Sequence, residues 1–466
     1  MVNDRRPTIE QVVQRKLCAG CGVCAGVCPH NALSMTIDKG RGSYVPALQT
    51  DRCTRCGLCY DVCPGHGVDF EAFNDALFGA TNEHIAVGRY LASYIGHATD
   101  KDLRYDSSSG GLVTALLVFA LEEGLIDGAL VTRMQRDRPL RPESFIARTP
   151  EEVLSAMGSK YCPVAAGTAL KEILESEGRY AVVGLPCHIQ GIRKAEQRIA
   201  ALRERIRYRI SIACSLDYSF RGTERVLASL GVTPEQVETI QYRGRGWPGS
   251  MLIRSKGGKE IRIPLADFYR QLGPYSLRRC TLCSDMLGEL SDLSCGDAWV
   301  PDVVRTDRVG SSFVISRTPE AEELLEYAAS KEAVQLSDLD LPALVASQGH
   351  ALFKKRKLQA RMRLFRLFAR SVPTYRQKLM AATRSDYLNT IKLYVARFVL
   401  AGNHPILAAL FRIARRRKSS VGKAAVRPAA ASNRPTRAST DPDGRATILD
   451  RQPAAKTQHV QHAENK

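Results

Sequence analysis

With 466 residues, the chain is long enough for two or three domains, and a hydrophobic content of 44% allows a substantial globular core. The net charge of +19 comes from the C-terminal part, because residues 351–466 hold 26 Lys and Arg against 5 Asp and Glu and leave the first 350 residues close to neutral. A nucleic-acid-binding body is therefore not expected. The fourteen cysteines, and an opening MVNDRRPTIE that lacks an apolar leader, argue against secretion and disulfide bonds and predict a cytoplasmic protein.

Two cysteine runs of identical spacing, Cys-x-x-Cys-x-x-Cys-x-x-x-Cys-Pro, occupy residues 18–64. Three thiolates at two-residue gaps wrap one cubane 4Fe-4S cluster, and in two-cluster ferredoxins the fourth cysteine of each run ligates the other cluster. Two zinc knuckles are the alternative, but zinc has no use for a third closely spaced cysteine or for the proline. We therefore predict two 4Fe-4S clusters, one held by Cys18, Cys21, Cys24 and Cys63 and the other by Cys53, Cys56, Cys59 and Cys28.

The 35-residue offset between the runs is an internal repeat, which predicts two halves related by a pseudo-two-fold axis. The insert over residues 32–46 is predicted to form a short hairpin that joins them. Residues 68–100 are predicted to be a connecting helix and loop. The cluster domain is accordingly placed at residues 1–75.

A serine- and glycine-rich turn, Ser107 to Gly111, precedes an apolar helix that is predicted to end at Gly124. Such a helix start exposes backbone N–H groups and the positive end of the helix dipole, which suits a phosphate or pyrophosphate. A plain N-cap with flexible glycines is the alternative. The local pattern leaves both interpretations open.

Strand and helix patterns then alternate. Strands are predicted at residues 128–132, 144–149, 179–184 and 205–214, and helices from residue 151, near 165–177 and from 189. This rhythm predicts an α/β domain, in which ligand sites gather outside the carboxyl ends of the strands. Cys187 and Cys214 both follow such ends.

A Cys280-x-x-Cys283 pair follows a hairpin that is predicted to turn at residues 257–258. A pair of this kind in a cytosolic protein is typical of a metal or redox site. We therefore predict a third 4Fe-4S cluster, held by Cys187, Cys214, Cys280 and Cys283. A zinc site made by the same four residues is the alternative, and Cys295 and Cys162 compete for places in the set.

The C-terminal part begins after one more strand and two helices, which are predicted over residues 312–350. Residues 351–418 mix basic and apolar residues at helical spacing and are predicted to form an arm that contacts an anionic membrane or an acidic partner. A solvated tail with a few helices packed on the body is the alternative. The arm lacks the roughly 20 uninterrupted apolar residues that a membrane-spanning helix needs. Residues 419–466 are rich in Ala, Pro, Arg and Ser and are predicted to be disordered.

With these motifs in hand, residues 15–350 resemble the beta-subunit family of coenzyme F(420) hydrogenases and dehydrogenases. The resemblance rests on the two cysteine runs and on six further segments: Ser108-Ser109-Gly110-Gly111, Gly158-Ser159-Lys160-Tyr161, Gly184-Leu185-Pro186-Cys187, Cys214, Cys280-x-x-Cys283-Ser284-Asp285 and Ser294-Cys295-Gly296-Asp297. Family members are iron-sulfur flavoproteins, so the resemblance implies FAD in a flavin-binding α/β domain over residues 76–350. It also implies that Ser108, Ser109, Gly110, Gly111 and Lys160 contact the flavin or its phosphates.

The expected function is that of an iron-sulfur flavoenzyme, in which FAD links the clusters to a two-electron substrate such as the deazaflavin coenzyme. A ferredoxin, hydrogenase or dehydrogenase subunit is the expected redox partner. Relatives differ in substrate, and this chain has Leu185 and His188 where relatives often carry Thr and Gln, so a tetrapyrrole or a polysaccharide-pathway intermediate is also considered. A non-enzymatic electron-transfer subunit is the alternative from another class. His188 is a candidate for proton transfer, with a structural role at a helix start as its alternative.

Overall fold

The computed structural model describes residues 6–79 and 81–400, with side chains described to residue 393. Met1–His404 make one compact unit, so the cluster segment and the α/β domain share a single body. The remaining residues, including the predicted disordered tail and the end of the predicted arm, lie outside the described residues.

The cluster segment consists of short helices around one hairpin. Its elements are α1 (Ile9–Gln14), α2 (Val23–Gly26), β1 (Leu33–Asp38), β2 (Ser43–Leu48), α3 (Leu58–Asp61) and β3 (Gly67–Asp69). β1 and β2 pair antiparallel, with Leu33 opposite Leu48, which confirms the predicted hairpin. α2 and α3 follow glycines in the same left-handed conformation, Gly22 and Gly57. The internal repeat of the sequence is therefore a repeat of backbone structure.

An eight-stranded mixed sheet forms the centre of the α/β domain, in the order β16-β6-β15-β14-β10-β9-β7-β8. The strands are β6 (Ala92–Ala98), β7 (Gly128–Met134), β8 (Pro142–Ala147), β9 (Tyr180–Gly184), β10 (Ile206–Ile212), β14 (Leu293–Asp297), β15 (Ser312–Ser316) and β16 (Val334–Asp338). β7, β9, β10 and β14 run parallel, whereas β8 and β15 pair antiparallel to their neighbours. The predicted α/β class is confirmed for these four parallel strands, of which β9 and β10 lead to Cys187 and Cys214.

Helices cover both faces of this sheet, because alternate strand residues point to opposite sides. On one face, Ala129 and Val131 pack with α6 (Leu112–Glu122), α7 (Pro150–Ser155) and α14 (Pro319–Ser330). On the other face, Leu130 packs with α8 (Leu170–Glu175), α9 (Pro186–Glu196) and α10 (Ala200–Arg205). Val23 and Val62 of the cluster segment belong to this second core, so the cluster segment packs on the helical layer that covers this face of the sheet.

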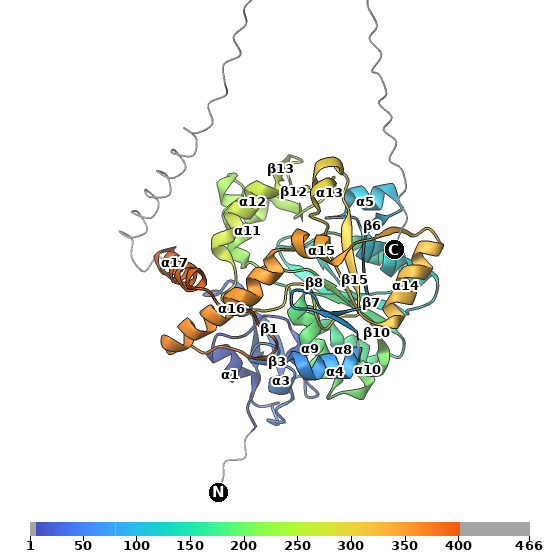
Figure 1. Ribbon diagram of the computed structural model, residues 1–466. Helices are drawn as coiled ribbons and strands as arrows, with labels where there is room; N and C mark the ends of the chain where they lie inside the picture. The colour runs from blue at the N-terminus through green and yellow to red at the C-terminus, as the bar shows by residue number, and fades with distance from the viewer. Residues whose placement is uncertain (1–5, 80, 401–466) are drawn as a thin grey trace, which may run out of the picture. The chain divides into compact units, whose positions relative to one another are not determined.

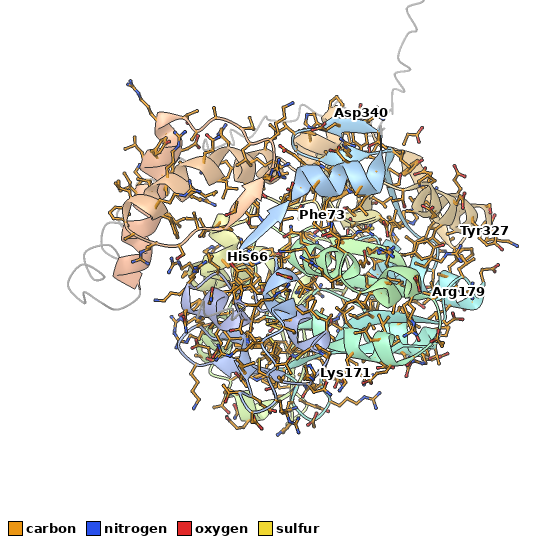
Figure 2. The ribbon with its side chains drawn as sticks, turned by 90° about the horizontal axis from the view of Figure 1, so that it is seen from below. His66, Phe73, Lys171, Arg179, Tyr327 and Asp340 are labelled. Carbon is orange, nitrogen blue, oxygen red and sulfur yellow. The ribbon has the colours of Figure 1, made fainter. Side chains whose placement is uncertain are left out.

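The connection over residues 68–100 contains more structure than predicted. α4 (Phe70–Phe78) is the predicted helix, but β4 (Asn82–His84), β5 (Gly88–Tyr90) and the sheet strand β6 follow it where a loop was expected. Figure 2 labels His66, at the end of the cluster segment, and Phe73, which α4 contributes to the second core. The predicted domain boundary near residue 75 thus falls inside α4.

A smaller unit extends from the sheet edge. It contains α11 (Phe220–Ser229), β11 (Val237–Gln241), β12 (Ser250–Ser255), β13 (Glu260–Pro264) and α12 (Leu265–Leu272), all around one core. β12 and β13 form the predicted hairpin, whose turn contains Gly258 in a left-handed conformation. The unit lies next to α13 (Pro301–Thr306) in Figure 1.

The C-terminal region contains α15 (Leu341–Ser347), α16 (His350–Leu367), β17 (Thr374–Arg376) and α17 (Arg384–Leu400). The expectation of an arm that begins at residue 351 is wrong for α16, since Leu358, Met362 and Phe365 pack against residues of the cluster segment. β17 pairs with β3 of the same segment. Figure 1 shows α16 running from α15 to the helices of the cluster segment. This apolar face is used inside the protein and is not open to a membrane.

No helix among the described residues is both long and apolar enough to cross a membrane. Peripheral contact of the remaining basic arm with anionic lipid stays a prediction.

Candidate redox site

The first group of thiols contains Cys18, Cys21, Cys24 and Cys63, three from the first cysteine run and the last from the second. Cys21, Cys24 and Cys63 are buried, with 6 to 7% of each residue exposed. Burial raises the pKa of the Cys24 thiol well above its ordinary value, and the neighbouring thiols of Cys21, Cys63 and Cys18 raise it further. The structure thus brings together the four residues predicted for one cluster, including the fourth cysteine of the opposite run.

The second group contains Cys28, Cys53, Cys56 and Cys59, which line one pocket together with His30 and Arg55. Burial raises the pKa of Cys59 to about 11, with smaller contributions from Cys56, Cys53 and Cys28. Cys56 is exposed, whereas no cysteine of the first group is. The second group is therefore the one that reaches the protein surface.

The third group assembles at the carboxyl edge of the sheet, where β9 and β10 lie side by side. Cys187 follows β9 and Cys214 follows β10, while Cys280 and Cys283 come from the 3-10 turn η4 (Arg278–Leu282) and the residue after it. Burial raises the pKa of Cys187 well above its ordinary value, and the thiols of Cys21, Cys214, Cys280 and Cys283 add to the shift. The four predicted residues therefore lie together, and Cys187 also lies next to Cys21 of the first group.

The two competing cysteines lie elsewhere. Cys295 is inside β14, paired with Ile212 and Val314 in the sheet, and burial is the cause of its raised pKa of about 12. Cys162 belongs to the core of the smaller unit and hydrogen-bonds with Tyr242. Neither contributes to the third group.

Buried ion pairs fix the elements that carry this group. Arg193 of α9 lies 2.5 Å from Asp292, which precedes β14, and Arg209 of β10 lies 2.8 Å from Glu196 of α9. All four side chains are less than 10% exposed. Pairs shielded from solvent in this way hold α9, and with it Cys187, against two central strands.

Within residues 6–79 and 81–400, no three or more His, Cys, Asp or Glu side chains converge as they would around a single metal ion. Ligation of clusters or of zinc by the three cysteine groups stays a prediction.

Buried cations surround the thiol groups. Lys194 donates to the carbonyl of Cys63 at 2.8 Å, Arg279 donates to the carbonyls of Pro64 and Gly65, and Lys354 donates to the carbonyl of Cys214 at 2.9 Å. Burial alone would lower the pKa of Lys354, but neighbouring thiols hold it above its ordinary value. A cubane with four thiolate ligands is anionic, so this charge distribution suits iron-sulfur clusters. Sequence reasoning missed these cations, since only Arg279 adjoins a cysteine.

The two stretches that the resemblance implies for the flavin meet at the same edge of the sheet. Ser108 Oγ accepts a hydrogen bond from the N–H of Ser159 at 2.8 Å, although the two residues are 51 positions apart. Ser109 Oγ donates to the carbonyl of Ser311, and the N–H of Gly110 donates to Ser312 Oγ. The turn before α6 is thereby held in one conformation.

This turn has the features of a phosphate site. Gly111 begins α6 in a left-handed conformation and no side chain caps the helix. Ser107 Oγ is buried and has no hydrogen-bond partner among the described residues, and a β-carbon on Gly111 would lie 3.1 Å from it. Free N–H groups and an unused hydroxyl fit the phosphate groups of a dinucleotide.

Lys160 and His188 are engaged in other contacts. Lys160 Nζ donates to the carbonyls of Ala156, Met157 and Gly158 at the end of α7, and burial lowers its pKa to about 7. His188 Nδ1 accepts the N–H of Leu185 at 3.2 Å, and burial lowers the pKa of the ring to about 4. The geometry therefore favours the structural alternative for His188.

A glycine-rich loop over residues 243–249 was missed by sequence reasoning. Arg243 binds both carboxylate oxygens of Asp297, at 2.6 and 2.5 Å, and Trp247 Nε1 donates to the same carboxylate. The β-carbon position of Gly158 lies 3.6 Å from the carbonyl of Arg243 and 3.8 Å from Ser108 Oγ. The loop over residues 243–249 thus borders the turn at residues 107–111. The sequence signal that could have indicated this loop is the presence of three glycines, a Trp and a Pro within seven residues.

A two-run cysteine segment packed on a mixed α/β domain, with a further thiol group where they meet, defines an iron-sulfur oxidoreductase subunit. A family model for the 4Fe-4S dicluster domain matches residues 17–67. Models for the N-terminal and C-terminal parts of the coenzyme F420 hydrogenase/dehydrogenase beta subunit match residues 93–171 and 177–341. The chain belongs to this beta-subunit family, and the predicted resemblance is confirmed.

Relatives are distant and carry different names. A coenzyme F420 hydrogenase subunit beta of Methanosarcina barkeri is 28% identical over 52% of this chain and 80% of its own length. A coenzyme F420-dependent sulfite reductase of Methanocaldococcus jannaschii is 29% identical over 71% of this chain, but the match spans 49% of that protein. A chain of the F420-reducing [NiFe] hydrogenase complex of Methanosarcina barkeri has the same fold, with a TM-score of 0.51, 23% identity, and coverage of 63% of this chain and 98% of its own.

Proposed function

We propose that this chain is the iron-sulfur flavoprotein subunit of an oxidoreductase, which relays electrons between a two-electron substrate and a protein partner. The observation that carries the proposal is the position of Cys187, which lies next to three thiols of the third group and next to Cys21 of the first. Cys24 of the first group in turn interacts electrostatically with Cys59 of the second. The three groups therefore form one continuous series, as a relay of one-electron carriers requires.

The first group is the most buried of the three and lies where the cluster segment meets the α/β domain. The cysteines of the third group are partly buried, and the second group reaches the surface at Cys56. We infer that a redox partner protein docks near the second group. Several relatives are named as subunits, which supports a protein partner.

The flavin site is proposed at the turn over residues 107–111 and the loops at 158–160 and 243–249. Cys162 and Asp217 lie on the side of this site that faces the third group. Asp217 N–H points to Cys280 Sγ at 3.5 Å, and Cys162 interacts electrostatically with both Asp217 and Lys160. A bound FAD would supply the conversion between two-electron and one-electron chemistry. Here the chain provides uncapped helix N–H groups for the phosphates.

The substrate is proposed to be a deazaflavin coenzyme, because proteins named for F420 match the α/β domain. A reductase of another substrate, such as a tetrapyrrole or a polysaccharide-pathway intermediate, is the second candidate. It is kept because Leu185 and His188 stand where relatives often carry Thr and Gln, a departure that bears on the identity of the substrate. A non-enzymatic electron-transfer subunit is the alternative in which no flavin binds.

Anaerobic purification followed by flavin and iron assays tests the proposal. We expect one FAD and about twelve iron atoms per chain, since three cubanes hold four each. Cys214→Ser and Cys280→Ser are each expected to lower the iron to about eight, whereas Cys295→Ser is expected to keep it. Intact clusters without flavin would favour the non-enzymatic subunit. Full iron content in both Cys214→Ser and Cys280→Ser would reject the third cluster.

Bleaching of the flavin band identifies the electron donor. Reduced deazaflavin, NAD(P)H and reduced ferredoxin are added in turn under anaerobic conditions. Bleaching by the deazaflavin alone would support the proposed substrate. Bleaching only by reduced ferredoxin would instead support the reductase of another substrate.

A further inference from the structure

A C-terminal strap, residues 350–376, lies outside all three matched family models yet contacts the third thiol group. Arg361 Nη1 donates to the carbonyl of Thr281 at 3.0 Å, and Tyr375 OH donates to the carbonyl of Leu282 at 2.9 Å. These are the two residues between Cys280 and Cys283. The strap therefore holds the Cys-x-x-Cys turn at both of its middle positions.

Lys354 is the residue by which the strap reaches the thiols. Its side chain is buried, with 8% of the residue exposed, and Nζ donates to the carbonyls of Cys214 and Asp285 at 2.9 and 3.4 Å. The thiols of Cys283, Cys214 and Cys280 are its strongest electrostatic partners. Lys354 thus faces three of the four residues of the third group.

The carboxylate of Asp285 acts on the charge of Lys354, but less strongly than the three thiols do and without forming an ion pair. Among the described residues, no Asp or Glu oxygen lies within ion-pair distance of its ammonium, whereas the adjacent Lys355 is 2.8 Å from Glu289. A buried charge is costly unless an opposite charge accompanies it. Four thiolates around a cubane provide such a charge at this place.

We propose that Lys354 is a positioning residue that supplies the counter-charge of the third cluster and raises its midpoint potential. This inference rests on the proposed function, because it requires a cluster at Cys187, Cys214, Cys280 and Cys283. Reduction adds one negative charge to the cluster, and a fixed cation in a medium of low dielectric constant stabilises the reduced form more than the oxidised form. The strap thereby makes the third cluster easier to reduce.

The experiment compares Lys354→Gln and Lys354→Arg with a control on the same helix. Lys357→Gln is suitable, since Lys357 is a lysine of the same helix whose ammonium lies 3.1 Å from the centre of the Phe353 ring rather than beside the thiols. Iron per chain and EPR-monitored redox titration of the third cluster are measured for each full-length protein. We expect a lower midpoint potential in Lys354→Gln and values near that of the unmodified protein in the other two. An unchanged potential in Lys354→Gln would overturn the proposal.

Loss of iron from a variant is also informative. If Lys354→Gln loses about four iron atoms while Lys354→Arg and Lys357→Gln keep them, a charge requirement is supported. If Lys354→Arg loses the same iron, the requirement is for the exact shape of lysine, and the counter-charge role is overturned. About eight iron atoms in the unmodified protein would mean that the third cluster itself is absent, which is a failure of the proposed function and is seen before any variant is made.

Discussion

The two halves of the cluster segment have the same cysteine spacing and nearly the same backbone, but different surroundings. α2 begins after Gly22 at φ 81° and ψ −8°, and α3 begins after Gly57 at φ 81° and ψ −7°. α2 nevertheless buries Val23, Cys24 and Gly26, whereas α3 buries no residue. Local sequence therefore determines the shape of each half, and contact with the α/β domain determines which half is shielded from solvent.

Glycine positions show how the first half is docked. A β-carbon on Gly26 would lie 2.0 Å from the carbonyl oxygen of Gly167, and one on Gly22 would lie 2.7 Å from that of Ala165. The position in the second half that corresponds to Gly26 is Asp61, whose carboxylate meets Arg198 at the surface at 3.4 Å. The close approach to the backbone of residues 165–167 is thus built into the first half only.

The largest expected effect comes from removing one cluster at a time, by substituting the ligand that the opposite cysteine run contributes to it. Cys63→Ser is expected to remove the first cluster, and Cys28→Ser the second, although each residue belongs to the opposite run. Each variant should lose about four of about twelve iron atoms. Cys63→Ser should also abolish electron transfer from the substrate to the partner side, because the first group is the middle of the series. Iron assay and a substrate-to-acceptor rate measure this.

Retention of the first cluster in Cys63→Ser would contradict the crossed arrangement. Cys295→Ser, which alters a buried cysteine away from all three groups, is the control and should keep both iron and rate.

The next effect concerns Gly26, the glycine that packs against the backbone of Gly167. Gly26→Ala is expected to destabilise the protein by about 3 kcal/mol, since the new methyl group meets backbone that cannot move aside cheaply. Asp61→Ala, at the matching position of the second half, should change stability by less than about 0.5 kcal/mol, because an exposed ion pair contributes little. Denaturant unfolding under anaerobic conditions compares the two. Equal effects would mean that the halves are not docked differently.

Much of this asymmetry was inaccessible to sequence reasoning. Cysteine spacing is local, so the composition of the two N-terminal groups follows from the repeat, and Cys187 and Cys214 were placed together because parallel strands end at one edge. β6 was missed because residues 92–98 read ASYIGHA, with small and polar residues and only two buried positions. Lys354 was missed because nothing near it in sequence marks a partner 140 residues away. Ligation by the twelve cysteines and the binding of FAD stay predictions.

Chelation of iron should resolve the two clusters by their exposure. When a water-soluble iron chelator and a mild oxidant are added, iron release is expected in two or more phases. The fastest phase is expected from the second group, because Cys56 is exposed. An opening that costs only about 1.4 kcal/mol more at the first group would already separate the rates tenfold. Cys28→Ser should lack the fastest phase. A fast phase that persists in that variant would show that the exposed cluster is not the labile one.

The smallest effect concerns the backbone conformation that the halves share. Arg55 has φ 56° and corresponds in the repeat to Gly20, at φ 77°. A side chain in the left-handed region costs about 1 kcal/mol, and replacement by glycine gives back about the same amount through the freedom of the unfolded chain. Arg55→Gly is therefore expected to leave the free energy of unfolding unchanged or to raise it by less than about 1 kcal/mol.

The reverse change in the first half, Gly20→Ala, should lower the free energy of unfolding. A β-carbon on Gly20 would lie 3.2 Å from the carbonyl oxygen of Tyr44, so Gly20→Ala adds a tight contact to the conformational cost and is expected to destabilise by about 1 to 2 kcal/mol. Arg55→Lys keeps both the charge and the strain and serves as the control. A loss of more than about 1 kcal/mol in Arg55→Gly would mean that the Arg55 side chain, which lines the pocket of the second group, stabilises the fold. If the loss is absent, the strained arginine is retained at the exposed cluster for a reason other than stability, as backbone strain at functional sites generally is.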